Sequence, residues 1–263
     1  GFHKIEGELH PVEGVLKYRG VNIGELLAEY GPNDRYIFER IAFLLLVGEM
    51  PTSSDFDLFI QMMEEERSLP EALIEHVIKG IPSKNIMNKL QSSVSALYAF
   101  DETADSMDPM ENFYKAVALI AKLPVIIAYS YLAAYQPDAK LVDPKPGMSA
   151  AELFLHIMNE GADVDPYEAH ILDLCLVLHA EHGGGNNSTF TTYVVSSSAS
   201  DIYSVIASSV GSLKGPLHGA ANSKVMEMMG AIKDHLNGSI DTEDVRQCIT
   251  DIMNKNFHDK TGK

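Results

Sequence analysis

Helical periodicity dominates this sequence from residue 34 onward and restricts the fold more than any other feature. Apolar side chains recur there at spacings of three and four, as in Phe56, Phe59 and Met63. Some segments, such as residues 117–135, are apolar around most of their circumference, and such helices must be buried among other helices. No alternating apolar and polar run long enough for a sheet follows residue 31. We therefore predict an all-α, multilayer helical fold.

Start and stop signals divide this helical region into segments. Asp34 is suited to cap a helix that ends at Gly48, and Ser53 or Ser54 is suited to begin a second that runs to about Arg67. Further helices are predicted at residues 70–78, 86–100, 109–121, 125–135, 150–160, 166–179, 201–213, 220–236 and 241–254, with Gly, Pro, Ser or Asp between them. Before Gly31, scattered glycines and alternating residues predict a short hairpin or irregular strands.

Charge and hydrophobicity exclude two classes of partner. The net charge is −17, whereas a phosphate-binding surface needs clustered Lys and Arg, so we expect no nucleic acid partner. An anionic substrate would need positive charge concentrated locally. The longest apolar runs have about eight residues, as around residues 41–47, which is far short of a membrane span, so we expect no membrane partner.

The chain has two cysteines, Cys175 and Cys248, which supply neither a disulfide framework nor a zinc-binding pattern. Cys175 lies in an apolar run and is predicted to be a core thiol. The first residues, GFHKIEGELH, have no basic flank followed by an apolar stretch, so no signal peptide is visible. These features favour a reducing compartment, and we expect a cytoplasmic location.

The first stretch with chemical potential is HAEHGGGNNSTF at residues 179–190. A metal site is not expected there, because the HExxH arrangement is absent and the H-x-E at residues 179–181 lacks its P-C-x-x-C partner. One interpretation is that His179 and His182 cap the end of a helix, where a cation is favoured. The glycines that follow weaken this interpretation, since a cap needs one glycine and several let a ligand approach the backbone.

The second stretch is GPLHGAAN at residues 215–222. Gly215 and Pro216 end one helix and Gly219 precedes another, so His218 is expected near a helix N-terminus, whose dipole disfavours imidazolium. A neutral imidazole at that place can donate a hydrogen bond to a carbonyl oxygen that becomes an enolate. A buried histidine satisfied by backbone carbonyls fits the sequence equally well. The two interpretations stay open on the residues alone.

Together, and in this order and separation, the two stretches resemble those of citrate synthase. Weaker matches to that family are LKYRG at residues 16–20, LLLVGEMPT at residues 44–52 and the run at residues 119–131. The resemblance implies a mainly helical, two-domain homodimer of the tricarboxylic acid cycle. It implies an acyltransferase that joins acetyl-CoA to oxaloacetate and releases citrate and CoA, without a metal or a redox cofactor.

The resemblance also implies three residue roles. His218 would be the catalytic histidine that hydrogen-bonds the thioester oxygen of acetyl-CoA and stabilises the enol or enolate. His182 would contact oxaloacetate, with Asn186 in the adjoining loop as a second substrate-binding residue. His179 also belongs to the motif, and we expect it to be structural.

By the same resemblance, residues 1–218 would form most of a large helical domain and residues 219–263 the beginning of a smaller one. The family continues with another substrate-binding histidine, arginines and a catalytic aspartate, none of which has a match here, so we expect this polypeptide alone not to turn over. Two alternatives stay open. One is 2-methylcitrate synthase, which uses propionyl-CoA, and the other is a non-catalytic binding or regulatory protein on the same framework.

Overall fold

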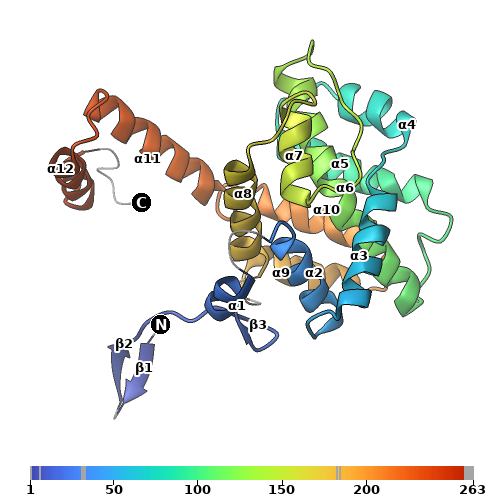
Figure 1. Ribbon diagram of the computed structural model, residues 1–263, viewed down its shortest axis with the longest axis horizontal. Helices are drawn as coiled ribbons and strands as arrows, with labels where there is room; N and C mark the ends of the chain where they lie inside the picture. Colours follow the sequence, from blue (N-terminus) through green and yellow to red (C-terminus); the bar gives the residue numbers. More distant parts are fainter. Residues whose placement is uncertain (1, 6, 31–33, 182, 184, 258–263) are drawn as a thin grey trace. The chain divides into compact units, whose positions relative to one another are not determined.

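A computed structural model describes residues 2–5, 7–30, 34–181, 183 and 185–257. The chain forms two compact units, residues 1–210 and 211–263. The domain boundary expected after residue 218 stays a prediction. Throughout the described residues helices dominate, with only four short strands, and the prediction of an all-α fold is confirmed (Figure 1).

The elements of the first unit begin with four strands and continue as helices. The strands are β1 (Phe2–Ile5), β2 (Glu8–Pro11), β3 (Lys17–Tyr18) and β4 (Val21–Asn22). The α-helices are α1 (Ile23–Tyr30), α2 (Ile37–Val47), α3 (Ser53–Glu66), α4 (Glu71–Leu73), α5 (Ile86–Leu97), α6 (Pro109–Tyr135), α7 (Ala150–Met158), α8 (Pro166–His179), α9 (Asn187–Ser196) and α10 (Ile202–Leu213), the last of which runs into the second unit. A π-helical turn, η1 (Ile74–Lys79), continues α4, and a 3₁₀ turn, η2 (Tyr98–Phe100), continues α5.

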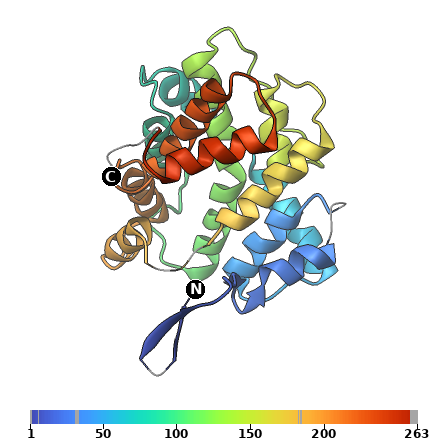
Figure 2. The same ribbon diagram turned by 90° about the vertical axis from the view of Figure 1, so that its left-hand side faces the viewer.

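Two antiparallel hairpins confirm the strands expected before residue 31. In the first, Lys4 of β1 lies opposite Leu9 of β2, and the pair projects from the helices of its unit (Figure 2). In the second, Tyr18 of β3 lies opposite Val21 of β4. This second hairpin is anchored, because Tyr18 is buried in a cluster with Ile23 of α1, residues of α2 and Val177 of α8.

The main core of the first unit surrounds α6. Its buried side chains face α5, α7 and α10, and Val117 and Ala121 pack with Phe43 of α2 and with Phe59 and Met63 of α3. By length and composition α6 could cross a membrane, but half of its most apolar stretch is buried within the unit. The same composition is expected of a core helix enclosed by other helices.

The break predicted between residues 121 and 125 is wrong, because α6 passes through Pro124 without interruption. Proline removes one backbone donor and crowds the preceding turn, which normally ends or kinks a helix. Here Val125, Ile126 and Ala128, just past the proline, are fully buried in the main core. The burial of this apolar segment in the core therefore outweighs the cost of a proline inside the helix.

Helix α8 presents one narrow face to the interior. Its buried residues are Ala169, Asp173 and Val177, which recur every four residues. Cys175 lies off this face and is exposed, so its predicted place in the core is wrong. An aspartate on the buried face of a helix needs a polar partner, and Asp173 finds one in the backbone N–H of Phe38 in α2.

The second unit contains two more helices, α11 (Ala220–Leu236) and α12 (Thr242–Met253), which pack against each other. Asn237 ends α11 with a left-handed backbone conformation. Asp241 begins α12 by accepting the N–H of Glu243, as its sequence position predicts. Cys248 of α12 is buried.

Candidate active site

The first motif lies at the junction of α8 and α9. Helix α8 ends at His179, whose Nδ1 lies 2.7 Å from the carbonyl oxygen of Cys175 one turn earlier. His182 lies outside the described residues. Gly183 has a φ of +92°, a conformation that favours glycine, and its N–H donates to the carboxylate of Glu181. This junction therefore turns sharply where the motif carries its glycines.

Asn186 caps α9, a helix that the sequence analysis did not predict. Its Oδ1 accepts the N–H of Thr189 at 2.9 Å, and its Nδ2 donates to Thr189 Oγ1 at 2.7 Å. The signal for this helix was present, since asparagine is among the preferred N-cap residues. Asn186 thus fixes the end of the α8–α9 junction, whichever ligand it meets there.

An open cavity of about 830 Å³ adjoins this junction within the first unit. Ala180, Glu181 and Gly183 line one part of it, and Lys17 and Arg19 from the second hairpin line another. Arg19 is held in place by bonds from Nη2 and Nε to the carbonyl oxygen of Leu45, at 3.0 and 3.3 Å. The cavity thus gathers two cations beside the glycine-rich motif in a chain whose net charge is −17.

The second motif lies in the second unit, in the turn that leads into α11. The N–H groups of His218 and Gly219 both donate to the carbonyl oxygen of Gly215, each at 3.0 Å. Gly219 is the N-cap of α11 and supplies no side-chain cap. The half-buried His218 therefore lies immediately before a helix N-terminus, where that motif predicted it.

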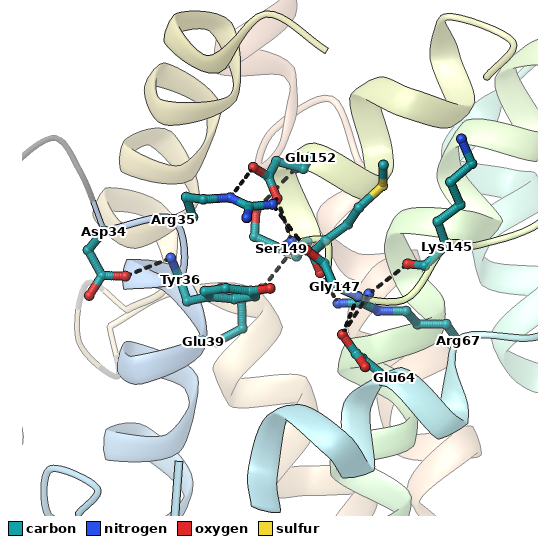
Figure 3. A network of polar contacts seen from close by, with 12 residues as sticks. Asp34, Arg35, Tyr36, Glu39, Glu64, Arg67, Lys145, Gly147, Ser149 and Glu152 are labelled. Carbon is teal, nitrogen blue, oxygen red and sulfur yellow. Dashed lines mark hydrogen bonds and ion pairs between the residues drawn. The ribbon is translucent and has the colours of Figure 1, made fainter. Parts of the chain in front are cut away.

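A polar network joins three helices and the segment before α7 in the first unit, with Glu39 and Arg67 buried and Arg35 at the surface (Figure 3). Glu39 of α2 is fully buried, and its Oε1 accepts the N–H of Ala150, the first residue of α7, at 2.6 Å. Arg67, at the end of α3, donates to the carbonyl oxygens of Met148 at 2.6 Å and Lys145 at 3.4 Å. Arg35 makes a two-pronged bond to Glu152 of α7, at 2.5 and 2.6 Å.

The residues of this network were not predicted from the sequence. Glu39 stands in the first turn of its helix, where an acidic residue is normally explained by the helix dipole and solvent exposure. A second buried carboxylate, Asp173 of α8, did leave a signal in the sequence. It lies four residues from Ala169 and four from Val177, and therefore on the same helix face as these two apolar residues. Among the described residues, no three His, Cys, Asp or Glu side chains are grouped to hold a metal ion.

Comparison with known proteins places these motifs in a family. The family described as "Citrate synthase, C-terminal domain" matches residues 4–261. Citrate synthase 2 of Bacillus subtilis is 35% identical over 224 residues, which cover 84% of this chain and 57% of that protein. The 2-methylcitrate synthase of Mycobacterium tuberculosis is also 35% identical, over 231 residues that cover 86% of this chain and 55% of that protein.

Solved structures show the same similarity. The citrate synthase of Pyrobaculum aerophilum has a TM-score of 0.74 and 33% identity, covering 84% of this chain and 54% of that one. A complex of carboxymethyl coenzyme A and oxaloacetate with the citrate synthase of Thermoplasma acidophilum has a TM-score of 0.73 and 26% identity, covering 92% and 59%. The chain spans little more than half the length of these relatives. Because the family match spans residues 4–261 and the fold agrees with that of solved citrate synthases, the chain belongs to the citrate synthase family.

Proposed function

We propose that the protein is a citrate synthase, which condenses acetyl-CoA with oxaloacetate and releases citrate and CoA. The observation that carries this proposal is the pairing of two motifs within one family match: the glycine-rich α8–α9 junction and His218 at the start of α11. A solved relative carries oxaloacetate and a coenzyme A derivative together, which supports this pair of small-molecule substrates. Lys17 and Arg19 outnumber the single carboxylate of Glu181 in the cavity beside the junction, which leaves local positive charge for an anionic substrate.

In this proposal His218 acts on the thioester. As a base removes a proton from the methyl group of acetyl-CoA, negative charge grows on the thioester oxygen, and the His218 imidazole donates a hydrogen bond to it. The resulting carbon nucleophile attacks the ketone of oxaloacetate, and water then cleaves the citryl thioester. The N-terminus of α11 points its partial positive charge toward the His218 turn and favours the same negative charge.

Binding of oxaloacetate is assigned to His182 and Asn186. Asn186 already has its amide engaged with Thr189, so its contribution includes holding the junction in one conformation. A loop fixed in advance loses less conformational entropy when ligand binds, which favours affinity. His182 supplies the direct contact in this proposal. No metal or redox cofactor is invoked for any step.

A second acyl substrate is supported by a specific relative. The Mycobacterium tuberculosis 2-methylcitrate synthase is as similar in identity to this chain as the Bacillus subtilis citrate synthase. Propionyl-CoA differs from acetyl-CoA by one methylene, and a hydrophobic pocket discriminates such a difference by about 10- to 200-fold at most. We propose acetyl-CoA as the preferred acyl substrate, and the activity assay compares the two acyl-CoAs directly.

We also propose that the protein acts as a homodimer. Helix α9 supports this with a row of exposed apolar side chains, Phe190, Tyr193 and Val194, spaced three and four residues apart on one face. Large exposed apolar groups clustered in this way mark interaction surfaces. Light scattering coupled to size-exclusion chromatography tests this, and a monomer at micromolar concentration would contradict it.

The proposed activity is tested with the protein at its full natural length. Release of CoA thiol is followed with a thiol-reactive dye in the presence of oxaloacetate and either acetyl-CoA or propionyl-CoA. We expect oxaloacetate-dependent release, faster with acetyl-CoA. The ratio of kcat/KM for the two acyl-CoAs decides between the two synthases. Release no faster than without oxaloacetate would refute both, and would favour a non-catalytic member of the family.

A further inference from the structure

Helix α2 receives its N-terminal cap from another helix. Its own N-cap residue, Tyr36, makes no side-chain capping bond. Instead Asp173, in the middle of α8 and 1% exposed, accepts the N–H of Phe38 at 3.2 Å through Oδ1. The first N–H groups of a helix have no acceptor within the helix. A carboxylate that accepts such an N–H satisfies that donor, and its negative charge also lies at the positive end of the helix dipole. Asp173 therefore fixes α8 to the start of α2.

The same device is repeated one helix further on. Glu39 of α2 (Figure 3) receives the first N–H of α7. Carboxylates therefore link α8 to α2 and α2 to α7. Both carboxylates keep a second oxygen, Asp173 Oδ2 and Glu39 Oε2, that is buried and has no hydrogen-bond partner among the described residues. A buried charge that is only partly satisfied is costly, and a carboxylate in this position avoids part of the cost by binding a proton.

Burial accordingly raises the pKa of Asp173 to about 7 and that of Glu39 to about 8, and the bonds from the helix amides only partly oppose this effect. The negative charge of Asp173 adds to the rise at Glu39. The charge on this pair therefore changes near neutral pH. Among the described residues, the other charged or titratable groups around the pair are Asp34, Arg35, Tyr36, Arg67, Glu152 and His170.

Helix α8 leads directly into the proposed oxaloacetate-binding junction. Asp173 lies six residues before His179, or about 9 Å along the helix axis. Near the far end of the helix, the buried Tyr18 hydroxyl donates to the carbonyl oxygen of Val177 at 2.7 Å. Two bonds to distant parts of the sequence thus hold α8, one at Asp173 and one at Val177. The residues that follow, Ala180, Glu181 and Gly183, line the cavity beside the junction.

We propose that Asp173 is a positioning residue for oxaloacetate binding: its carboxyl group, by capping α2, holds α8 where the α8–α9 junction can receive the substrate. Ionisation of Asp173 weakens this hold, because the packed helices then bury a charge with one oxygen unsatisfied, and this cost exceeds the gain from a stronger bond to the helix amide. Oxaloacetate affinity therefore falls as Asp173 loses its proton. This inference rests on the proposed function.

The test is Asp173→Asn in the protein at its full natural length. Asparagine keeps the shape and one acceptor oxygen, and it imitates the protonated aspartate at every pH. The ratio of the oxaloacetate KM of this variant to that of the wild type is measured from pH 6 to pH 8. We expect a ratio near one at pH 6 that falls to roughly one tenth at pH 8, with kcat changed much less, since each pH unit above the raised pKa of the buried carboxyl costs the wild type about tenfold.

The matched control is Asp165→Asn, the same chemical change on the same helix. Asp165 is exposed and caps α8 itself by accepting the N–H of Tyr167 at 2.7 Å, and asparagine caps equally well. Its KM ratio should stay near one throughout the pH range. Taking the ratio to wild type at each pH removes the titration of the site histidines, which both proteins share.

A second variant keeps the inference testable if Asp173→Asn does not fold. Tyr18→Phe removes the other bond that holds α8, at Val177, without adding or removing a group that titrates between pH 6 and 8. It should raise the oxaloacetate KM by a similar factor at both ends of the range. An unchanged KM in a folded Tyr18→Phe variant would overturn the link between α8 and the substrate.

The outcomes separate the two proposals. A KM ratio for Asp173→Asn that is constant with pH overturns the positioning role and leaves citrate synthesis by the wild type intact. A wild type that forms no citrate at any pH overturns the proposed function and this inference with it. A ratio for Asp173→Asn that falls as pH rises, with no change for Asp165→Asn, supports the positioning role, and a ratio that rises with pH overturns it.

Discussion

Replacing Glu39 with glutamine should make the free energy of unfolding less sensitive to alkaline pH. Glu39 is fully buried, with one oxygen on the Ala150 amide and the other without a partner among the described residues. Glutamine keeps the acceptor for Ala150 and the size of the side chain, but it cannot ionise. At pH 5, where the folded glutamate is protonated, the two proteins should differ by less than about 1 kcal/mol, since both then bury a neutral group with one unsatisfied polar atom.

The size of the effect follows from the pKa of Glu39, which burial raises from 4.5 to about 8. A carboxylate whose pKa is higher in the folded state stabilises the fold fully below its unfolded pKa, and this stabilisation is lost as pH rises through the folded pKa. The loss is about 1.4 kcal/mol for each pH unit, or about 5 kcal/mol in full between pH 4.5 and pH 8. Between pH 5 and pH 8, the glutamine variant should therefore gain roughly 4 kcal/mol relative to the wild type.

Urea denaturation at pH 5, 6, 7 and 8 measures this difference directly. The matched control is Glu168→Gln, because Glu168 holds the same third position in α8 that Glu39 holds in α2, but is exposed. It should cost a few tenths of a kcal/mol through the helix dipole, with little change above pH 5. A stability difference for Glu39→Gln that stays flat from pH 5 to pH 8 would refute the reasoning, since Glu39 would then be ionised throughout.

Three further predictions concern the proposed active site in the protein at its full natural length. His218→Ala should lower kcat by about 10²-fold or more and change oxaloacetate affinity much less, as steady-state kinetics and calorimetry can determine; near-normal turnover would remove His218 from the mechanism. His182→Ala should mainly weaken oxaloacetate binding in the same titration, and unchanged binding would contradict its assignment. Asn186→Ala should lose about 1 kcal/mol of stability, because it removes the α9 cap. Asn186→Asp should keep the cap but bind oxaloacetate poorly, because it adds negative charge to the site. If Asn186→Asp and the wild type bind oxaloacetate equally well, the role of Asn186 is restricted to capping.

The sequence predicted most helices because their apolar faces repeat with helical period and their ends carry ordinary caps. Asp108, Ser149 and Asp165 each cap the helix that follows them, so those starts were visible in local sequence. The uninterrupted passage of α6 through Pro124 was not visible, because the helix continues only through burial of its flanks. Tertiary packing cannot be judged from a local proline rule.

The candidate site was predicted in part for a similar reason. Motif spacing placed His218 before a helix, and it is found there. Asn186 was expected in a loop, whereas in the structure it caps α9. The carboxylates of Glu39 and Asp173 escaped prediction because their partners are remote: the bonded residues are 111 and 135 positions away in the chain. A charge on an otherwise apolar face signals such a contact but does not say which segment will meet it.

The remoteness of those capping groups also bears on how the chain folds. Helices α3 and α7 carry complete capping boxes within their own sequence, so their first turns can form in a short segment. Helix α2 has no such cap and can close its first turn fully only after α8 has been brought to it, across a loop of more than a hundred residues. The location of the capping groups therefore predicts an order of folding. The first turn of α3 can form early from local residues, whereas the first turn of α2 is completed late, when it docks with α8, the helix that leads into the substrate junction.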